Sequence, residues 1–213
     1  MSYIVNVTLT ILKGCITTLE IYAVTAVLSF PLGIAGALGK ASRFKILRKA
    51  LDIYTLVIRG TPLMLQIFFA YYGLPTLGIT FSPFSAAAIT FVINYAAYLT
   101  EIFRAGIESI DRGQYEAARV LGMNYFQTMR RVILPQAVRR VLPPTCNESI
   151  NLIKDTALLS VISMGDLLQA AKEAVTRDFN ITPFFIAAAV YLIMTSVMIA
   201  IFKKLENKYS VYE

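Results

Sequence analysis

Long apolar runs constrain this chain more than any other feature of its sequence. Several stretches of about 20 residues carry almost no charge, and a helix of about that length is needed to cross the roughly 30 Å hydrocarbon core of a bilayer. Charged residues make up 15% of the chain, whereas soluble domains carry about 25%. We therefore predict an all-α integral membrane protein in which residues 1–213 form one transmembrane domain.

Five membrane-spanning helices are predicted, and the charges between them set their direction. The segment 40–49 holds five basic residues and no acidic one, and such segments stay on the cytoplasmic side. The N-terminus is therefore expected outside and the C-terminus inside. A cleaved signal peptide is the alternative for the first run, but its apolar part should be only about 7–15 residues long. The predicted spans cover about 16–38, 51–73, 84–104, 143–168 and 184–202.

The chain lacks the residues of most catalytic and metal-binding sites. It has no histidine and two cysteines, which excludes Cys-His nucleophiles and zinc motifs. Residues 33–40 read GIAGALGK, but the spacing of the outer glycines and Ala41 after the lysine do not fit a P-loop. No metal, cofactor or nucleotide site is expected in this chain. Its net charge of +7 is attributed to basic cytoplasmic segments rather than to nucleic-acid binding.

The longest polar interval, residues 113–135, carries the most specific motif. It reads GQYEAARVLGMNYFQTMRRVILP, with Gly122 six residues after Glu116. Asp111 is predicted to cap a first short helix, and Gly122 to end it with a positive φ. Asn124 is expected to cap a second helix that ends before Pro135. The spacing resembles the EAA loop of ABC importer permeases, through which an ATPase subunit drives the membrane subunit. A plain amphipathic connector is the alternative.

The likeness extends over roughly residues 15–205. The stretches RGTPLMLQIFFAYYGLP (59–75), YLTEIFRAGIESIDRGQYEAARVLGM (98–123) and ILPQAVRRVLPPTCNESINLIKDTALLSVI (133–162) resemble the permease subunit of polar amino acid ABC importers of the histidine/glutamine/arginine type. This resemblance implies a type I ABC importer permease in the prokaryotic cell (inner or plasma) membrane. Two positions depart from the family pattern: Asp155 stands where members often carry Asn, and Val132 where the loop usually has Ile.

The resemblance also implies partners and a coupling surface. The partners are a second permease, identical or paralogous, two ATPase subunits that bind ATP and Mg, an extracytoplasmic amino-acid-binding protein and membrane lipid. The first helix of the loop is expected to insert into a cleft on the ATPase, where small residues allow close approach. The residues assigned to this contact are Glu116, Ala117, Ala118 and Gly122.

Polar side chains inside the predicted spans mark a candidate substrate path, because burying them in lipid is costly. Counting about 1.5 Å per residue places most of them near the middle of the membrane. We expect six residues to line a water-filled cavity at the axis of the permease pair: Asn94, Tyr98, Asn151, Lys154, Asp155 and Thr156. Lys154 would hold a carboxylate and Asp155 an ammonium group. An internal ion pair of these two residues is the alternative.

Glu101 lies deeper toward the cytoplasmic side, at a depth similar to that of Arg59. Three roles remain open for its carboxylate: selection of a cationic side chain, contact with the amino group of the substrate, or an ion pair with Arg59, which would make Arg59 part of a gate.

The sequence thus favours the membrane subunit of an ATP-driven importer that takes up a polar, possibly basic, amino acid by alternating access, without enzymatic activity of its own. A stand-alone channel or ion-coupled secondary transporter, coupling through Lys154, Asp155 or Glu101, is the main alternative. An odd number of spans cannot divide into two equal halves, which counts against most secondary transporters. A membrane scaffold is the third hypothesis.

Overall fold

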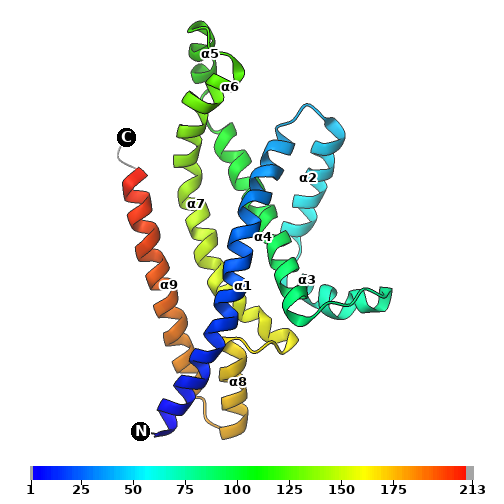
Figure 1. Ribbon diagram of the computed structural model, residues 1–213, viewed down its shortest axis with the longest axis vertical. Helices are drawn as coiled ribbons and strands as arrows, with labels where there is room; N and C mark the ends of the chain where they lie inside the picture. Colours follow the sequence, from blue (N-terminus) through cyan, green and yellow to red (C-terminus); the bar gives the residue numbers. More distant parts are fainter. Residues whose placement is uncertain (1, 210–213) are drawn as a thin grey trace.

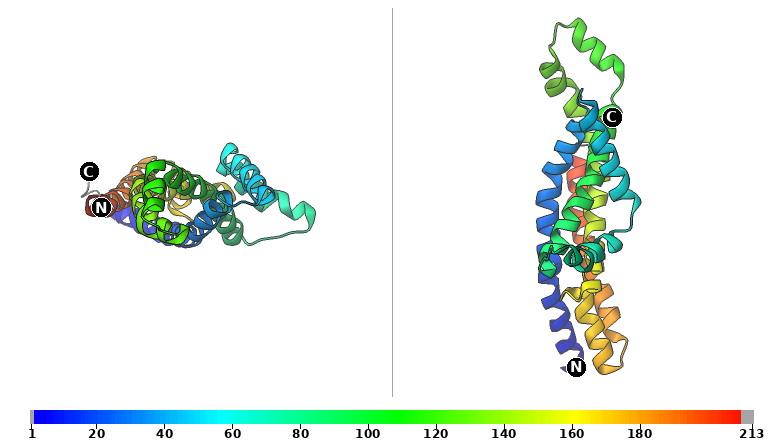
Figure 2. Two further views of the ribbon diagram at one scale, coloured as in Figure 1. Left: turned by 90° about the horizontal axis from the view of Figure 1, so that it is seen from above. Right: turned by 90° about the vertical axis from the view of Figure 1, so that its right-hand side faces the viewer.

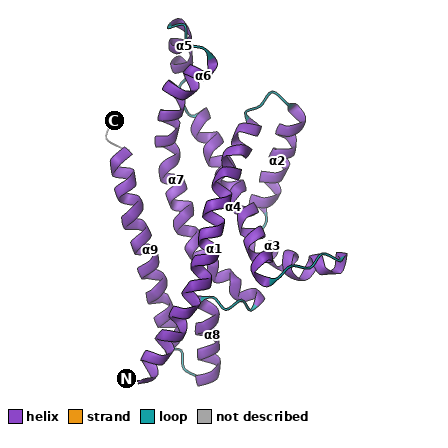
Figure 3. Cartoon of the chain, viewed as in Figure 1, coloured by secondary structure: helices purple, strands orange, loops and turns teal. Residues whose placement is uncertain are grey.

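The computed structural model describes residues 2–209, and every regular element among them is helical (Figure 3). Short π turns at Phe69–Gly73 and Met129–Ile133 and 3-10 turns at Leu74–Leu77 and Thr156–Ile162 extend some of the helices. The prediction of an all-α protein is confirmed. The α-helices are α1 (Ser2–Lys40), α2 (Lys45–Gly60), α3 (Leu63–Phe68), α4 (Pro83–Glu108), α5 (Arg112–Val120), α6 (Tyr125–Thr128), α7 (Leu134–Asp155), α8 (Leu167–Asp178) and α9 (Thr182–Tyr209).

The long helices form an elongated bundle (Figures 1 and 2). Helix α4 packs against both α1 and α7, α2 lies against α1 and α4, and α9 lies against α1, α7 and α8. Helices α5 and α6 extend beyond the bundle at one end, which we call the α5–α6 end (Figure 1). Helix α8 and the beginning of α1 form the other, the α8 end (Figure 1).

Among the described residues, the helices α1, α4 and α9 are long and apolar enough to cross a membrane. The bent pair formed by α2 and the segment from α3 to Leu77 adds a fourth crossing if it is counted as one span. Helix α7 runs along the same axis (Figure 1) but carries Glu148, Lys154 and Asp155. The number of five crossings and the direction of the chain stay predictions.

Several predicted boundaries differ from the observed ones. The first helix begins at Ser2 rather than near residue 16, and the helix expected from residue 143 begins at Leu134. The segment 169–183, expected as an outer loop, is largely the helix α8. The predicted bounds followed the longest uncharged runs, whereas the helices continue past single polar or charged residues such as Lys13 in α1 and Arg139 in α7.

The second predicted span, 51–73, is broken rather than continuous. The helix axis turns by 102° between α2 and α3. Thr61 adopts an extended conformation with φ −118° and ψ 146°, as expected for a residue before proline, and Pro62 cannot donate a backbone hydrogen bond. The break leaves backbone carbonyl groups of α2 without helical partners.

Glycine residues at positions 33 and 36 let α1 approach α4 closely. A Cβ atom at Gly36 would lie 2.2 Å from Thr100 Oγ1, and one at Gly33 would lie 2.6 Å from Leu99 Cβ. Such contacts between small residues are a common way to pack helices in lipid.

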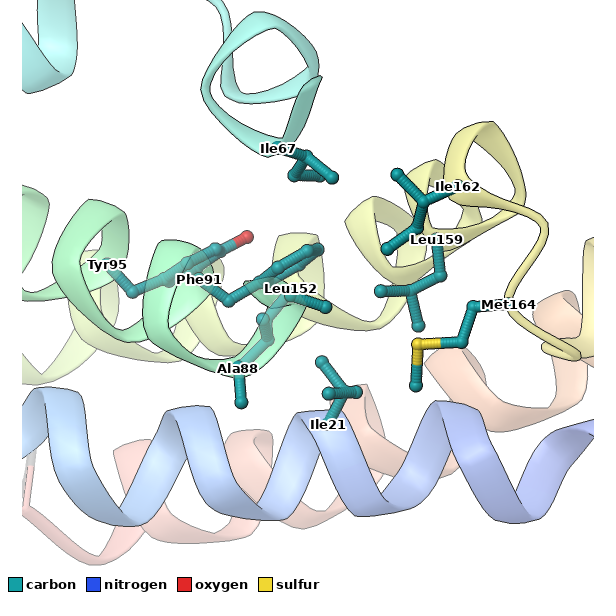
Figure 4. Packing of buried hydrophobic residues seen from close by; sticks show 10 residues of the cluster. Ile21, Ile67, Ala88, Phe91, Tyr95, Leu152, Leu159, Ile162 and Met164 are labelled. Atoms are coloured by element: carbon teal, nitrogen blue, oxygen red, sulfur yellow. The ribbon is translucent and has the colours of Figure 1, made fainter. Parts of the chain in front are cut away.

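A buried apolar cluster joins α1, α3, α4, α7 and the 3-10 turn that follows α7 (Figure 4). Ile21, Ile67, Phe91 and Leu159 are completely buried in it. The ring of Tyr95 stacks on that of Phe91 with an interplanar angle of 2°. Helix α9, in contrast, exposes Leu192 and Ile193 by more than 60%, as expected for a surface that faces lipid. The cluster fixes α4 and α7 beside the break between α2 and α3.

Candidate functional site

A polar cavity of about 450 Å³ lies where the α2–α3 break meets α4 and α7. Its polar side chains come from three parts of the chain that are far apart in sequence. Helix α2 contributes a cation, α4 contributes one amide and two phenol groups, and α7 contributes one amide and two carboxylates. These residues are Arg59, Asn94, Tyr95, Tyr98, Glu148, Asn151 and Asp155.

Helical spacing explains why the α4 and α7 residues face the same cavity. Asn94 and Tyr98 are one turn apart on α4, and Glu148, Asn151 and Asp155 follow the i, i+3, i+7 pattern on α7. The predicted residues Asn94, Tyr98, Asn151 and Asp155 are therefore brought together. Their role in a substrate path stays a prediction.

Two contacts order the charged groups of the cavity. The Arg59 guanidinium lies over the Tyr98 ring, with Cζ 5.2 Å from the ring centroid, a cation–π arrangement. The Tyr95 hydroxyl donates a hydrogen bond of 2.7 Å to Asp155 Oδ2. Arg59 thus faces the aromatic wall of α4, whereas Asp155 is held from one side by a neutral donor.

Sequence reasoning left out two of these residues. Glu148 was visible in the polar stripe of α7 but was not assigned to the path. Tyr95 precedes Tyr98 by three positions on α4, so the same helical spacing that grouped Asn94 with Tyr98 includes it. This spacing was the available signal for both residues.

Lys154 and Thr156 do not line this cavity of the single chain, and their place in a cavity at the axis of the permease pair stays a prediction. Lys154 is exposed. Among the described residues no ion pair joins Lys154 to Asp155, so that alternative is not observed either. Thr156 is completely buried and donates its hydroxyl hydrogen to Ile153 O at 2.6 Å, because the helix tightens into a 3-10 turn there.

Glu101 belongs to a separate ionic network, and the pair with Arg59, one of the three roles left open for it, is not observed among the described residues. Lys40, at the end of α1, binds Glu101 Oε1 and lies 2.8 Å from Asp52 Oδ1 of α2. The Thr55 hydroxyl donates to Glu101 Oε1 at 3.0 Å. Arg104 donates to Glu101 Oε2 through Nε at 3.0 Å and Nη2 at 2.8 Å. The carboxylate is therefore fully engaged outside the cavity, since the end of α1 reaches it.

The polar interval forms a projecting pair of short helices at the α5–α6 end (Figure 1). Its local predictions are largely confirmed. Asp111 Oδ1 accepts from Gly113 N at 2.7 Å, Gly122 has a φ of +72°, and Asn124 forms a capping box with Gln127.

The expected stop before Pro135 is wrong, because α6 continues through a π turn into α7. Pro135 falls in the first turn of α7, directly after the π turn, which interrupts the α-helical hydrogen-bond pattern. The π turn itself closes with wider hydrogen bonds than an α-helix. The segment is thus directly continuous with the helix that carries Glu148 and Asp155.

Exposed apolar residues distinguish the tip of this projection. Val120, Leu121, Tyr125 and Phe126 are between 69% and 87% exposed. Glu116, Ala117 and Gly122 are also exposed, whereas Ala118 is 2% exposed in the single chain, and the ATPase contact of these four residues stays a prediction. Sequence reasoning missed the four apolar residues, although their position beside Gly122 in a polar segment was a signal. Such a patch is typical of a surface that binds a partner.

Comparison with known proteins gives consistent matches. Residues 29–211 match the family described as binding-protein-dependent transport system inner membrane component. The chain is 41% identical to the arginine transport system permease protein ArtQ of Bacillus subtilis (strain 168), over 93% of this chain and 91% of the relative. It is 37% identical to the putative glutamine transport system permease protein GlnP of Rickettsia felis, over 93% and 92%.

A solved structure entitled "Crystal structure of an amino acid ABC transporter with histidines" superposes with a TM-score of 0.91, at 36% identity over 96% of each chain. A structure of the MetNI methionine ABC transporter shares the fold, with a TM-score of 0.71 at 16% identity over 93% of this chain and 94% of that one.

Proposed function

The chain belongs to the family of binding-protein-dependent transport system inner membrane components, and on this premise we propose that its polar cavity carries a cationic amino acid. The protein is a permease subunit of an amino acid ABC importer in the bacterial inner (plasma) membrane. It works with a second permease and with ATPase subunits that hydrolyse the ATP, so it is not an enzyme itself. This assignment replaces the alternative of a stand-alone secondary transporter.

The charges of the cavity carry the proposal for the substrate class. One guanidinium, from Arg59, faces two carboxylates, from Glu148 and Asp155, so the formal balance is one positive against two negative charges. Uncompensated charges at membrane depth are costly. A substrate with a net positive charge balances this set, whereas a neutral amino acid leaves one carboxylate in excess. Arg59 would take the carboxylate of the substrate, a role predicted for Lys154.

The named relatives are compatible with this chemistry. One relative is named as an arginine permease and another as a putative glutamine permease, and both amino acids are polar. The observation that favours arginine here is the pair of carboxylates, since a glutamine side chain needs no counter-charge. Delivery by an extracytoplasmic binding protein at the α8 end completes the proposed path. It places the α5–α6 end in the cytoplasm, in agreement with the basic segment 40–49.

Transport by the reconstituted complex tests the substrate class. The permease, its ATPase and its binding protein are placed in proteoliposomes, and Vmax/KM is measured for arginine and for glutamine. The wild type should favour arginine. Asp155→Asn should lower the arginine-to-glutamine ratio by about tenfold, the value of a charge-assisted hydrogen bond. Glu173→Gln is the control, because Glu173 is an exposed carboxylate on α8 outside the cavity. An unchanged ratio in Asp155→Asn would contradict the proposed cation preference.

The apolar tip at the α5–α6 end is proposed as the ATPase docking surface, together with Glu116, Ala117 and Gly122. Leu121→Asp places a charge in the middle of this surface and should abolish co-purification of the ATPase. Phe179→Asp is the matched control: Phe179 is 96% exposed at the other end of the molecule. Loss of the ATPase from both variants, or from neither, would contradict the assignment of the docking surface.

A further inference from the structure

The α2–α3 break is closed by one side chain, Gln66 of α3. Its Nε2 atom donates to Ile58 O at 2.8 Å, to Thr61 Oγ1 at 2.8 Å and to Thr61 O at 3.2 Å. The carbonyl groups of Ile58 and Thr61 lie at the end of α2, where the helical donors are missing. Gln66 therefore supplies the donors that the break removes.

These contacts fix which end of the Gln66 amide faces the break. Backbone carbonyl groups can only accept hydrogen bonds. The Thr61 hydroxyl hydrogen is already donated to Val57 O at 2.8 Å, so Thr61 Oγ1 also acts as an acceptor. Every group around Nε2 thus requires a donor, and the amide cannot turn over without placing its oxygen against other oxygens. The Gln66 nitrogen stays at the break, and its oxygen points toward α4.

The fixed Gln66 oxygen in turn orients Asn94. Asn94 Nδ2 donates to Gln66 Oε1 at 3.0 Å, and no other orientation of the Asn94 amide offers a donor there. Asn94 lines the polar cavity, whereas Gln66 does not. With its nitrogen committed to Gln66, Asn94 turns its oxygen away from α3. No group among the described residues donates to this oxygen.

We propose that Gln66 is a positioning residue that makes Asn94 present an oxygen acceptor, not an N–H donor, to the substrate. This inference rests on the proposed function, because it concerns binding of an amino acid in the same cavity. The acceptor selects a nitrogen donor of the substrate, either its ammonium group or a cationic side chain. A reversed amide would aim its N–H groups at that cation. The Asn94 oxygen therefore attracts a cationic group of the substrate, as the two carboxylates of α7 do.

Substitution of Gln66 separates this role from support of the bend. Gln66→Met removes every hydrogen bond and frees the Asn94 amide to turn. Gln66→Glu loses the donors to the carbonyl groups but keeps an oxygen for Asn94 Nδ2. Tyr54→Phe is the matched control, since Tyr54 joins α2 to α4 through a 2.6 Å hydrogen bond to Ile93 O, whereas the Asn94 side chain bonds to Gln66. Each variant is measured in the full complex with its ATPase, in proteoliposomes.

The expected result is a change in KM without a change in kcat. Gln66→Met should raise KM for arginine about fivefold, the value of one hydrogen bond, with kcat and ATPase co-purification retained. Tyr54→Phe should stay close to the wild type, whereas Gln66→Glu, which sets an oxygen against the acceptors at the break but keeps one for Asn94 Nδ2, should raise KM less than Gln66→Met does. In an Asn94→Leu background, Gln66→Met should add nothing further. Should Gln66→Met fail to assemble, Gln66→Ala takes its place in the same comparison.

Two results would overturn the inference. One is an equal rise of KM in Gln66→Glu and Gln66→Met, which would mean that Gln66 acts by supporting the bend between α2 and α3 rather than by orienting Asn94. The other is a Gln66→Met effect that persists in full beside Asn94→Leu. All measurements are repeated with glutamine. A rise in KM for both substrates identifies the shared ammonium group as the donor to the Asn94 oxygen. A rise in KM for arginine alone identifies the cationic side chain as that donor. A wild type that prefers glutamine contradicts the proposed cation preference but leaves the test of Gln66 intact.

Discussion

Glu101→Gln should destabilise the permease without changing its preference among amino acids. The carboxylate accepts from Lys40 and Thr55 through Oε1 and from Arg104 through Oε2. Its side chain is 14% exposed and that of Lys40 is 5% exposed. Glutamine keeps one oxygen but places an NH₂ group against a cation on the other side. The substitution thus removes the negative charge that lies between two cations, although Lys40 keeps Asp52 and Arg104 keeps Glu108 as partners.

The loss of unfolding free energy in Glu101→Gln depends on which contact is lost. Removal of one partner from a buried ion pair costs about 3–5 kcal/mol. Arg104 is 33% exposed, so its share is partly screened by solvent, and Lys40 keeps Asp52 as a second partner. We therefore expect a loss of about 2–4 kcal/mol. The loss should appear as looser packing of α1, α2 and α4, which the network joins at the α5–α6 end.

Thermal unfolding of the purified complex measures the loss of stability, and uptake of arginine, lysine and glutamine measures the preference among amino acids. Glu108→Gln is the control, because Glu108 is 61% exposed and also binds Arg104. An exposed pair of this kind contributes about 0–1 kcal/mol. A lower Tm for Glu101→Gln with unchanged substrate ratios is expected. A changed substrate ratio at unchanged Tm would refute the structural role and return Glu101 to the transport path.

A further prediction concerns packing. Gly33→Ala should cost about 1–3 kcal/mol by overpacking, since its Cβ would meet Leu99 Cβ, whereas Gly39→Ala should be nearly neutral because its Cβ would meet Leu51 Cδ1, the far end of a flexible side chain. Tm values compare the two variants, and an equal loss in both would contradict the close approach of α1 to α4 at Gly33.

Local rules predicted what depends on near neighbours in sequence. The caps at Asp111 and Asn124 and the positive φ of Gly122 follow from conformational preferences of single residues. The shared face of Asn151 and Asp155 follows from helical spacing.

Contacts between distant segments lay beyond such rules. The pair of Lys40 and Glu101 joins residues 61 positions apart, and it depends on α1 extending to Lys40 beside α2. Depth counting placed Glu101 level with Arg59, yet depth does not give the rotation of one helix relative to another. The role of Gln66 required the 102° bend at Pro62, which hydropathy does not contain. A sequence reveals candidates for a polar site, but pairing them needs the packing of the helices.

The two helices that connect the α5–α6 end to the cavity differ in stiffness. Helix α4 contains proline only in its first turn, at Pro83, where no hydrogen bond is lost. Helix α7 contains Pro143 and Pro144 in its interior, and interior prolines remove backbone hydrogen bonds and favour bending. The pair lies between the π turn and Glu148. A displacement of α5 and α6 is therefore expected to bend α7 against a rigid α4.

Replacing both prolines with alanine tests whether this bend moves the cavity walls. The variant restores two backbone donors and stiffens α7, while the docking tip and every cavity residue remain. ATPase binding should be unchanged, but transport per ATP hydrolysed should fall, because Glu148, Asn151 and Asp155 no longer shift relative to α4. Pro83→Ala, at the first turn of α4, is the control and should transport normally. Equal transport rates for the double variant and the wild type would show that α7 moves as a rigid body.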